Sequence, residues 1–402
     1  MKRIVFVLGN YKNGGMAMHA TNLMNEYATR GYVCDILALG EVSDKPFTTL
    51  GNNVTVVDVA KYNAEHSDDP AVISDRKRRF AEIKRLKRLR YFTRFFPSKD
   101  KEISRRIKVL RAGEKLRPYF VNNHGVTAIA FGVSYIAGTV GATDGLECKV
   151  IYAEKNAPQI EFGGEAPDND YCFDLLNSIN AVIVQTADAK NYLGQFVGNV
   201  KVINNPVKPD LPSPFTGERR HTIVNFCRMS GQKNIGLLLD AFALFRKTHP
   251  DYSLEVYGNT VSSEEETYRD EMIAKAESMG LADAVRILPP AADVHQKVRD
   301  AAMFVSSSDY EGLSNSMLEA MAIGLPCVCT DCLGGGTREV MTDGDNGLII
   351  PMNDPHAMSK AMIRFAEHPE LADSCSREAA KIRETLSVKT IAKQWLEVIE
   401  NC

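Results

Sequence analysis

The sequence lacks a long apolar run near its start. Its first apolar stretch, Ile4–Leu8, is too short for the hydrophobic region of a signal peptide or for a membrane-spanning helix. The sequence also lacks internal repeats, low-complexity tracts and transmembrane segments. Its 402 residues are 44% hydrophobic and 25% charged, which is typical of a soluble globular protein. At about 150 residues per domain, this length predicts two or three domains.

Cysteine pairs at metal-binding spacing are also lacking. The chain has nine cysteines, an odd number without a secretory signal, which predicts reduced thiols in a cytoplasmic protein. Cys327, Cys329 and Cys332 lie close together in "LPCVCTDCLGGG", but no second Cys or His pair at zinc-finger spacing is near them. Because Cys327 and Cys329 alternate with Val328 as in a buried strand, we interpret all three as structural thiols.

Acidic residues are scarce in one segment, although the net charge of the chain is −3. Residues 76–117 contain 18 Lys and Arg against 4 Asp and Glu, so the rest of the chain carries −17. The cations alternate with aromatic and aliphatic residues in "DRKRRFAEIKRLKRLRYFTRFFPSKDK". Three interpretations stay open: residues 76–101 contact an anionic membrane surface, form a solvated helix that packs on its own domain, or bind an acidic acceptor. We expect no nucleic-acid partner.

Short β-rich runs alternate with helix-length segments along the chain. The first half has "RIVFVL", "VCDILAL", "VTVVDV", "YFVNN", "KVIYA", "AVIVQ" and "KVIN". The second half has "TIVNF", "SLEVYG", "VRIL", "MFVSS", "CVCT" and "GLII". This alternation predicts parallel sheets with helices on both faces, the α/β fold class. We expect two doubly wound, Rossmann-like domains that face each other across a cleft, with ligands at the carboxyl ends of the strands.

A proline-rich stretch, "NNPVKPDLPSPFTGERR", separates the two halves. Four prolines fall between Pro206 and Pro214, which indicates a linker. We therefore predict an N-terminal domain over residues 1–207, with the basic insert at 76–117, and a C-terminal domain over 208–385. The last helix, over 386–402, is expected to return to the N-terminal domain.

The first strand is followed by a glycine-containing turn, "LGNYKNGGMAMHA". Gly9 and Gly14 have the spacing of a phosphate loop, but Gly15 and Met16 replace its lysine and its Ser or Thr. No G-x-G-x-x-G is present either. The Gly14–Gly15 pair either lets the backbone approach a ligand at the helix N-terminus or forms a plain strand-to-helix turn. His19, inside that helix, is interpreted as structural.

Two cations follow the first strand of the second half, in "NFCRMSGQKNIGLLLDAF". Arg228 and Lys233 bracket a loop that opens a helix. At a strand end, beside helix N–H groups, such a pair can neutralise a diphosphate. The alternative is an exposed basic loop.

Two carboxylates flank a helix start in "EGLSNSMLEAMAIG". Leu313–Ser316 begin the helix, whose free N–H groups favour an anion. Glu311 and Glu319 have simple alternatives, a solvated turn carboxylate and a capping box with Ser316. Those alternatives leave unexplained why both carboxylates flank this helix start. Because carboxylates accept hydrogen bonds from vicinal hydroxyls, one can hold a sugar and the other a ribose, as a nucleotide-sugar requires.

The motifs "RMSGQKN", "EGLSNSMLEAMAIGLPCVCTD" and "GGGTREVMTDGDNGLIIP" together resemble those of the family-4 retaining glycosyltransferases of GT-B fold. The likeness extends across nearly the whole chain. It implies that Glu311 contacts the donor sugar, that Glu319 contacts the ribose, and that Arg228 and Lys233 hold the diphosphate. The donor-binding residues implied by the resemblance are Gly14, Gly15, Arg228, Lys233, Leu288, Glu311, Leu313, Ser314, Asn315, Ser316 and Glu319.

A catalytic histidine is also implied by the resemblance. "NNHG" at Asn122–Gly125 matches a strand end where such enzymes often place an active-site histidine, here His124. The alternative is that His124 caps a turn. The resemblance thus implies catalytic roles for His124, Glu311, Arg228 and Lys233. In "YAEKNAP", Lys155 stands where relatives that act on polysaccharides often have His or Arg, which leaves the acceptor undetermined.

The implied reaction is a retaining, metal-independent transfer of a hexosyl or N-acetylhexosaminyl group. A nucleotide diphosphate sugar, most simply a UDP-sugar, would donate to a hydroxyl of a cell-surface glycan, glycolipid or anionic glycopolymer bound by the N-terminal domain. The two Asp-x-Asp matches, at 168–170 and 343–345, are interpreted as turns, and no cofactor or metal is expected. We expect a cytoplasmic enzyme, with a peripheral position on the inner membrane face left open. The alternatives are a non-catalytic GT-B subunit and a UDP-sugar 2-epimerase.

Overall fold

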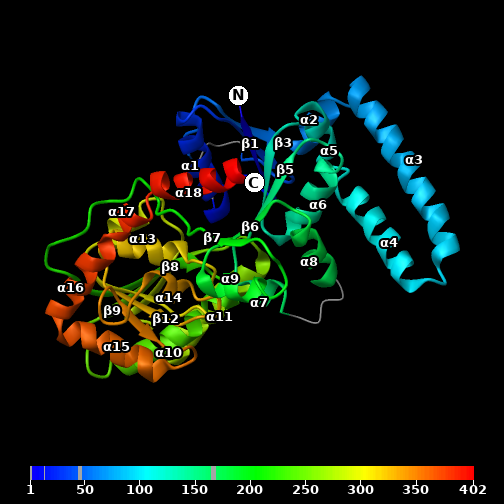
Figure 1. Ribbon diagram of the computed structural model, residues 1–402. Coiled ribbons are helices and arrows are strands. Elements are labelled where there is room, and N and C mark those ends of the chain that lie inside the picture. Colours follow the sequence, from blue (N-terminus) through cyan, green and yellow to red (C-terminus); the bar gives the residue numbers. More distant parts are fainter. Residues whose placement is uncertain (1, 13, 44–47, 164–168) are drawn as a thin grey trace. The chain divides into compact units, whose positions relative to one another are not determined.

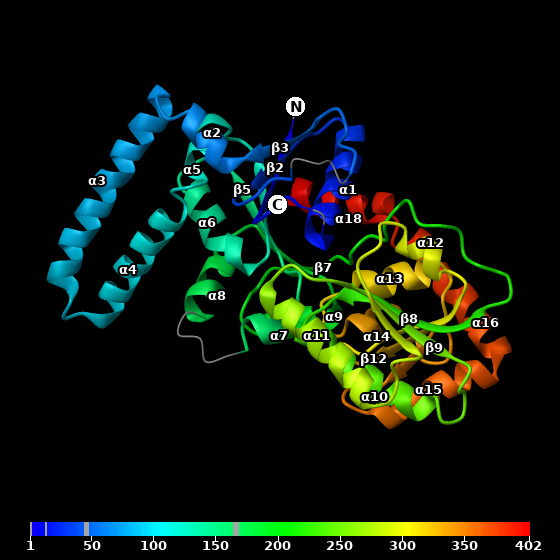
Figure 2. The same cartoon turned by 180° about the vertical axis from the view of Figure 1, so that it is seen from behind.

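The computed structural model describes residues 2–12, 14–43, 48–163 and 169–402, which form two compact units (Figures 1 and 2). The first unit comprises residues 1–184, 190–203 and 391–402, and the second comprises residues 185–189 and 204–390. Each is an α/β unit built on one parallel sheet, as the sequence predicted. No helix in the described part of the chain has both the length and the apolar character that a membrane crossing needs.

The N-terminal unit is built on a seven-stranded parallel sheet in the order β3-β2-β1-β4-β5-β6-β7. The strands are β1 Arg3–Leu8, β2 Val33–Ala38, β3 Val54–Asp58, β4 Thr127–Phe131, β5 Lys149–Ala153, β6 Ala181–Val184 and β7 Val200–Val202. The helices are α1 Gly15–Thr29, α2 Val59–Glu65, α3 Pro70–Thr93, α4 Pro97–Ala112, α5 Arg117–Asn122, α6 Val133–Thr143, α7 Pro158–Glu161 and α8 Asn169–Asn177. Helix α9, Ala187–Leu193, and helix α18, Val388–Asn401, each begin in the second unit and end in the first.

Alternating side chains of β1 give this sheet two apolar faces. Val5 and Val7 belong to a core cluster with residues of α5, such as Phe120. On the other face, the ring of Phe6 lies 5.0 Å from that of Phe131 and 6.4 Å from that of Trp395 in α18. The last helix therefore completes the core of the first unit, although it is far from β1 in the sequence.

One predicted strand of this unit is wrong. Residues 119–122 of the "YFVNN" run belong to helix α5, which has Pro118 in its first turn, where proline is well tolerated. The strand of this region is instead β4, "TAIAF", which pairs with β1 and β5. Its two alanines have low β-propensity, so the strand is defined by burial between its neighbours rather than by its composition.

The basic insert forms a helical hairpin of α3 and α4, which pack against each other (Figures 1 and 2). At its base, Arg117 in α5 donates two hydrogen bonds of 2.7 and 2.8 Å to Asp75 in α3. Both side chains are buried, and Arg78 also contacts Asp75. Burial opposes ionisation of Asp75, but the Arg117 guanidinium outweighs it and lowers the pKa of this carboxyl. The buried ion pair therefore anchors the hairpin.

The C-terminal unit is built on a six-stranded parallel sheet in the order β10-β9-β8-β11-β12-β13. Its strands are β8 Arg220–Arg228, β9 Ser253–Asn259, β10 Val285–Leu288, β11 Ala301–Ser306, β12 Cys327–Thr330 and β13 Leu348–Ile350. Its helices are the 3-10 helix η1 Gly231–Lys233, α10 Ile235–Phe245, α11 Ser263–Ser278, α12 Val294–Val298, α13 Asn315–Ala322, α14 Gly336–Val340, α15 Pro355–Glu367, α16 Pro369–Ala380 and α17 Ile382–Thr385. An apolar core of α10, α15 and the strands supports the sheet.

The anchor of the hairpin can be tested by removing one or the other arginine around Asp75. Arg117→Leu leaves a buried carboxylate without its main partner, so we expect a loss of about 3–5 kcal/mol of unfolding free energy. Arg78→Leu, the matched control, removes a side chain that is 66% exposed and should cost about 1 kcal/mol or less. Urea denaturation monitored by circular dichroism measures both. Because the folded pKa of Asp75 is lowered, its contribution is present at neutral pH and is lost as pH falls below the ordinary value of 3.8. Equal losses in the two variants at neutral pH would contradict this anchor.

Candidate functional site

The strand order of the C-terminal unit reverses between β8 and β11. The chain runs from β8 outward to β9 and β10, and then crosses to β11 on the other side of β8. In doubly wound sheets, ligands bind at the carboxyl ends of the strands beside such a reversal. Arg228 is the last residue of β8, and Glu311 lies in the segment that follows β11. The topology therefore places two of the predicted site residues at the position where a ligand is expected.

Lys233 and Glu311 form an ion pair at this position. The backbone of Lys233 is held in place, because its carbonyl accepts a 2.8 Å hydrogen bond from the Ser307 hydroxyl. Asn234 follows in the left-handed conformation, with φ 44°, and its side chain caps α10. Burial opposes the charge of Lys233, but the carboxylate of Glu311 outweighs it and raises the pKa of Lys233.

The pair corrects two expectations. The Lys233 side chain is only 15% exposed and the Glu311 side chain only 11%, so neither the exposed basic loop nor the solvated turn carboxylate describes them. The Ser308 hydroxyl donates a 2.8 Å hydrogen bond to Oε1 of Glu311, the same oxygen that Lys233 contacts. Oε2 accepts one long bond of 3.4 Å, from Gln232. The second oxygen therefore keeps capacity to accept a hydrogen bond from a ligand.

The turn of Glu311 is packed against the start of α14. A side chain at Gly336 would collide with the carbonyl oxygen of Gly312, so this approach requires glycine. The Glu311 amide also donates to the Leu333 carbonyl at 2.9 Å. These backbone contacts fix the carboxylate in place.

Arg228 provides a second, more exposed cation. Its side chain is 52% exposed, and its Nε lies 3.1 Å from Glu265 in the first turn of α11. Its charge lowers the pKa of Lys233, although this effect is smaller than those of burial and of Glu311. Arg228, Lys233 and Glu311 therefore share one electrostatic neighbourhood, with Arg228 on its solvent side.

The N-terminus of α13 follows Glu311 closely in the sequence. Ser314 is its N-cap and accepts a 3.4 Å hydrogen bond from the Met317 amide. The Leu313 amide donates to the Gln185 side chain at 2.7 Å, which braces the segment before the helix. Within the described residues, the amides of Asn315 and Ser316 have no acceptor. These two N–H groups and the helix dipole favour an anion.

Glu319 is held by a residue that the motifs did not indicate. Nε2 of His295, in α12, lies 2.8 Å from Oε2 of Glu319. The capping-box interpretation of Glu319 is wrong, because the helix begins after Ser314 and Glu319 lies beyond its first turn. His295 is buried, with its ring against that of Phe226. No spacing in the sequence links His295 to Glu319, so only the tertiary structure reveals this contact.

Leu288, the last residue of β10, is also at the carboxyl edge of this sheet and is half-buried. Gly14 and Gly15 belong to the other unit, where Gly14 precedes α1 in an extended conformation that any residue can adopt. Leu288 therefore belongs to the second unit, whereas Gly14 and Gly15 belong to the first.

The placement of His124 is a correction. It was expected at a strand end, but it lies after α5 and before β4, exposed to solvent. Thr127 at the start of β4 pairs with Ile4 near the start of β1, so His124 is at the amino edge of the sheet. The turn of Gly14 and Gly15 follows the carboxyl end of β1, at the opposite edge. We therefore leave His124 out of the site.

Lys155 and Glu154 are the charged residues that follow the carboxyl end of β5 in the N-terminal unit. Nζ of Lys155 lies 4.2 Å from the ring centre of Phe131, the last residue of β4. Burial lowers the pKa of Lys155 to about 7. The Glu154 carboxylate accepts the hydroxyl of Tyr152 and the amides of Lys155 and Asn156. The carboxyl edge of this sheet thus carries a lysine and a carboxylate rather than the expected histidine.

The acidic motifs do not form a metal cluster in the described part of the chain, where no group of three or more His, Cys, Asp or Glu could hold a metal ion. Asp343 accepts a 2.9 Å hydrogen bond from the Ile349 amide within a turn. Of the other match, Asp168 lies outside the described residues, and Asp170 is in α8, 3.1 Å from Lys101. Cys327, Cys329 and Cys332 are free and buried, in agreement with structural thiols.

Two all-parallel, doubly wound units are the architecture of the GT-B fold, as the sequence predicted. Solved structures show the same fold. TarM of S. aureus, in a complex that includes UDP, is 17% identical with a TM-score of 0.74, covering 99% of this chain and 100% of that chain. Anabaena HepE, in complex with UDP and glucose, is 17% identical with a TM-score of 0.73 and full coverage of both chains.

The second unit matches a family model. Residues 211–382 match the model described as glycosyl transferases group 1. This match confirms the predicted resemblance over residues 211–382. Among curated relatives, the poly(ribitol-phosphate) alpha-N-acetylglucosaminyltransferase of Staphylococcus aureus is 27% identical over 256 residues, which is 63% of this chain and 50% of that protein. The chain spans half or less of the length of the first curated relatives it matches.

The burial of the Lys233–Glu311 pair can be tested by stability measurements. Lys233→Met leaves a buried carboxylate without its cation and should cost about 1–3 kcal/mol of unfolding free energy. Arg228→Met, the matched control at an exposed cation, should change stability by about 0.5 kcal/mol or less. Adding Glu311→Gln to Lys233→Met removes the unpaired charge, so the double variant should regain part of the loss. Chemical denaturation at neutral pH measures all three, and a double variant no more stable than Lys233→Met alone would contradict the pairing.

Proposed function

We propose that the chain is a retaining, metal-independent glycosyltransferase that uses a UDP-sugar as donor. The observation that carries this proposal is the buried Lys233–Glu311 pair beside Arg228 at the switch point of the second unit. A nucleotide-sugar has a matching set of groups, because it presents sugar hydroxyls next to a diphosphate. The group 1 match over residues 211–382 supports the same function.

The diphosphate is bound by cations and helix N–H groups. Arg228, more than half exposed, presents a guanidinium that pairs well with phosphate oxygens. Lys233 adds a buried ammonium, and the amides of Asn315 and Ser316 add donors at the positive end of α13. Donors fixed before the reaction stabilise the charge that develops on the leaving diphosphate. This set takes the role that a metal ion has in other sugar transfers, so we propose that no metal or other cofactor is required.

The sugar and the ribose are bound by the two glutamates. Oε2 of Glu311 has capacity for a sugar hydroxyl, while Oε1 stays fixed by Lys233 and Ser308. Glu319 accepts the ribose hydroxyls, and His295 orients it as a positioning residue. Leu288, Leu313 and Ser314 line the donor from neighbouring segments of the same unit.

The chemistry is a substitution at the anomeric carbon with retained configuration. The bond from this carbon to the diphosphate oxygen breaks, and a bond to the acceptor oxygen forms on the same face of the sugar. The acceptor hydroxyl passes its proton to the departing phosphate oxygen, so UDP leaves without a covalent sugar–enzyme intermediate. Arg228, Lys233 and the α13 amides hold the negative charge during departure.

The acceptor is a hydroxyl of a glycan, a glycolipid or an anionic glycopolymer. The name of the Staphylococcus aureus relative, a poly(ribitol-phosphate) alpha-N-acetylglucosaminyltransferase, supports an anionic polymer. The basic insert, with 18 cations against 4 acids over 76–117, is suited to anionic surfaces or acceptors. We place the protein in the cytoplasm, with peripheral contact to the membrane.

Donor use can be tested with labelled UDP-sugars, with and without a polymer acceptor. We expect sugar transfer by the wild type in the presence of EDTA, and about 10²–10³-fold slower turnover for Arg228→Ala, as for loss of one fixed donor to developing charge. Arg286→Ala, which removes an exposed cation paired with Glu255 on β9, is the control and should retain turnover. Transfer that stops in EDTA and returns with a divalent metal would contradict metal independence, and near-normal turnover of Arg228→Ala would contradict the diphosphate role.

The ribose role of Glu319 can be tested by comparing UDP with 2′-deoxy-UDP. The wild type should bind UDP about tenfold or more tightly than the deoxy analogue, since a hydrogen bond to a charged group contributes about 1.5–3 kcal/mol. Glu319→Gln should lose most of this discrimination with little change in melting temperature. His295→Phe should lose part of it, because the carboxylate is no longer oriented. Calorimetric titration measures the affinities, and full discrimination in Glu319→Gln would exclude the ribose role.

A further inference from the structure

The distal end of the α3–α4 hairpin exposes four aromatic side chains. Tyr91, Phe92, Phe95 and Phe96, here called the aromatic tip, are 63%, 71%, 75% and 58% exposed. Pro97 begins α4 directly after them, so the chain turns sharply between the two helices. Scattered exposed apolar residues are normal in proteins, but a contiguous group of this size indicates an interaction surface.

The distal half of the hairpin has no core of its own. The small apolar cluster of Ile83, Ile103, Ile107 and Leu110 lies toward the base. No residue from 84 to 102 is buried. The interpretation of the basic segment as a helix that packs along its own domain therefore holds for the base only.

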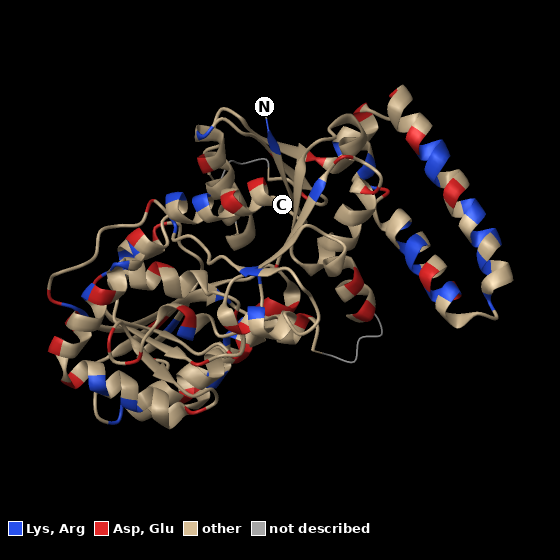
Figure 3. Cartoon of the chain, in the orientation of Figure 1, with Lys and Arg blue, Asp and Glu red and all other residues tan. Residues whose placement is uncertain are grey.

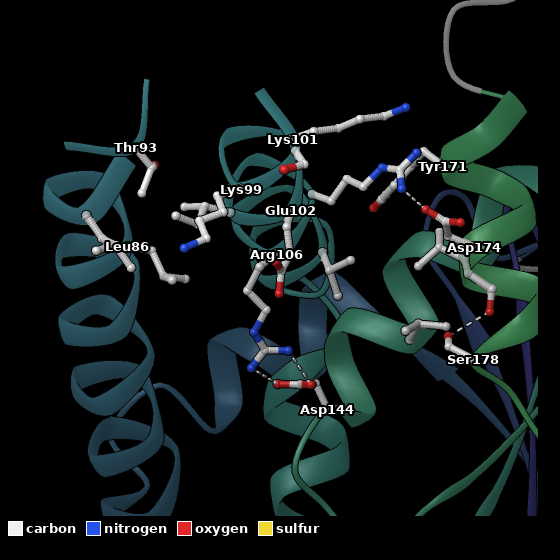
Figure 4. Close-up of a pocket in the computed structure, with 17 residues that line it drawn as sticks. Leu86, Thr93, Lys99, Lys101, Glu102, Arg106, Asp144, Tyr171, Asp174 and Ser178 are labelled. Atoms are coloured by element: carbon white, nitrogen blue, oxygen red, sulfur yellow. Dashed lines mark hydrogen bonds and ion pairs between the residues drawn. The ribbon is translucent and has the colours of Figure 1, made fainter. Parts of the chain in front are cut away.

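A hollow of about 1000 Å³ is lined by residues of α3, α4, α6 and α8 (Figure 4). Leu86 and Leu89 of α3 line one side, and Tyr171 and Leu175 of α8 line the other. The aromatic tip side chains are not among the residues that line the hollow. The tip is thus presented to solvent rather than to the unit that carries it.

Two sets of cations on the hairpin differ in whether they are paired within the unit. Those of α4 that face α6 and α8 are neutralised within the unit. Lys101 lies 3.1 Å from Asp170. Arg105 contacts Asp174, and Arg106 donates hydrogen bonds to Asp144 (Figure 4). Because these charges are paired, they contribute little attraction toward an external surface.

The second group lies on α3 (Figure 3). Lys84, Arg85, Lys87 and Arg88, here called the outer cations, are all exposed, and none forms an ion pair with any residue that the structure describes. Arg90, the next cation, is already paired with Asp100 at 2.9 Å. At 1.5 Å per residue, the outer cations lie within roughly 12 Å of Phe92 along the helix, comparable to the Debye length of about 8–10 Å.

Two further cations sit on the aromatic tip itself. The Arg94 guanidinium lies 4.7 Å from the ring centres of both Tyr91 and Phe95, and Nζ of Lys99 lies 5.9 Å from that of Phe96. Arginine and aromatic side chains in contact suit the headgroup layer of a bilayer, where apolar and charged groups meet.

We propose that the aromatic tip inserts into the headgroup region of an anionic lipid bilayer, while the outer cations contact lipid phosphates. A soluble polyanion would satisfy the cations but leave four exposed aromatic rings without a partner. An anionic bilayer offers a partner for each, because the boundary between headgroups and acyl chains can take up the aromatic rings and the lipid phosphates can contact the cations. The hairpin would then act as a rigid anchor, held at its base by the Asp75–Arg117 pair. This inference does not depend on the proposed reaction, because it requires no turnover.

The aromatic contribution is tested by co-sedimentation with vesicles of equal parts phosphatidylglycerol and phosphatidylcholine at low salt. We expect the wild type to bind these vesicles and not vesicles of phosphatidylcholine alone. Phe92→Ser and Phe95→Ser should each weaken binding about tenfold, as expected for losing one buried aromatic ring. The matched control is Phe80→Ser, on the same helix and 69% exposed but toward the base, which should bind as the wild type. If Phe80→Ser and Phe92→Ser weaken binding equally, α3 lies along the surface and the tip insertion is wrong.

The charge contribution is tested by replacing the four outer cations with glutamine. At about 1 kcal/mol per cation near an anionic surface, this variant should bind at least about 100-fold more weakly. The control replaces four exposed cations outside the hairpin, Lys247, Lys360, Arg377 and Lys393, and has the same net charge. Equal weakening in both quadruple variants would contradict a local contact and indicate only the overall charge.

Insertion itself is tested with Phe95→Trp. The protein has one tryptophan, Trp395, which is fully buried, so a tip tryptophan would report its own environment. We expect a blue shift of its emission on anionic vesicles and none on a soluble polyanion such as polyphosphate. No shift on anionic vesicles, or an equal shift on polyphosphate, would overturn the proposal. UDP affinity, measured on the same variants, should stay unchanged and so separates this outcome from failure of the proposed reaction.

Discussion

Parallel strands place all their carboxyl ends at one edge of a sheet, and the candidate site depends on this constraint. In the C-terminal unit, β8 and β11 are neighbours in the sheet. Because they are parallel, a short hairpin turn cannot connect them, and a longer crossover is needed. The crossover through β9 and β10 brings Arg228 and Glu311 to the same edge from positions far apart in the sequence. The ligand position is therefore set by topology, and the side chains then determine which chemistry is possible there.

The Lys233–Glu311 pair converts this position into a fixed arrangement of charges. A buried carboxylate is costly unless it is paired, and a buried ammonium has the same cost. The carboxylate of Glu311 and the ammonium of Lys233 lower the cost of burying each other's charge. Ser308 and the backbone near Gly336 limit the movement of Glu311. Fixed charges lose little energy to reorganisation when a diphosphate departs. Arg228, which is more exposed, is held by Glu265 at 3.1 Å.

Periodicity in the sequence predicted the two sheets well, because buried parallel strands have apolar runs that few other elements show. It failed at β4, where Ala128 and Ala130 are strand residues only because neighbouring strands bury them. The adjacent run Tyr119–Asn122 looked more β-like but follows Pro118 into a helix. That error moved His124 to the wrong edge of the sheet. A single mistaken element can therefore misplace a functional residue while the fold class stays correct.

For the candidate site, sequence patterns identified the charged residues but not their environment. The spacing of Glu311 and Glu319 was visible, but the burial of Lys233 depends on tertiary contacts such as Ser307 to its carbonyl. The contact of His295 with Glu319 joins two elements with no shared periodicity. Local rules such as the capping box describe only neighbours along a helix, and here the helix begins two residues earlier than the rule assumes.

The basic insert shows the same difference between composition and placement. Its charge excess is plain from the sequence, yet only the structure separates the cations that are paired within the unit from those on the outer face of α3. Four of its aromatic residues already lie close together in the sequence, and the turn before Pro97 places these four at one end of the hairpin. The hairpin is stabilised at its base by a buried ion pair, whereas its tip has no core and is exposed. That division is what an anchor requires, since the attached end must resist the force that the inserted end transmits.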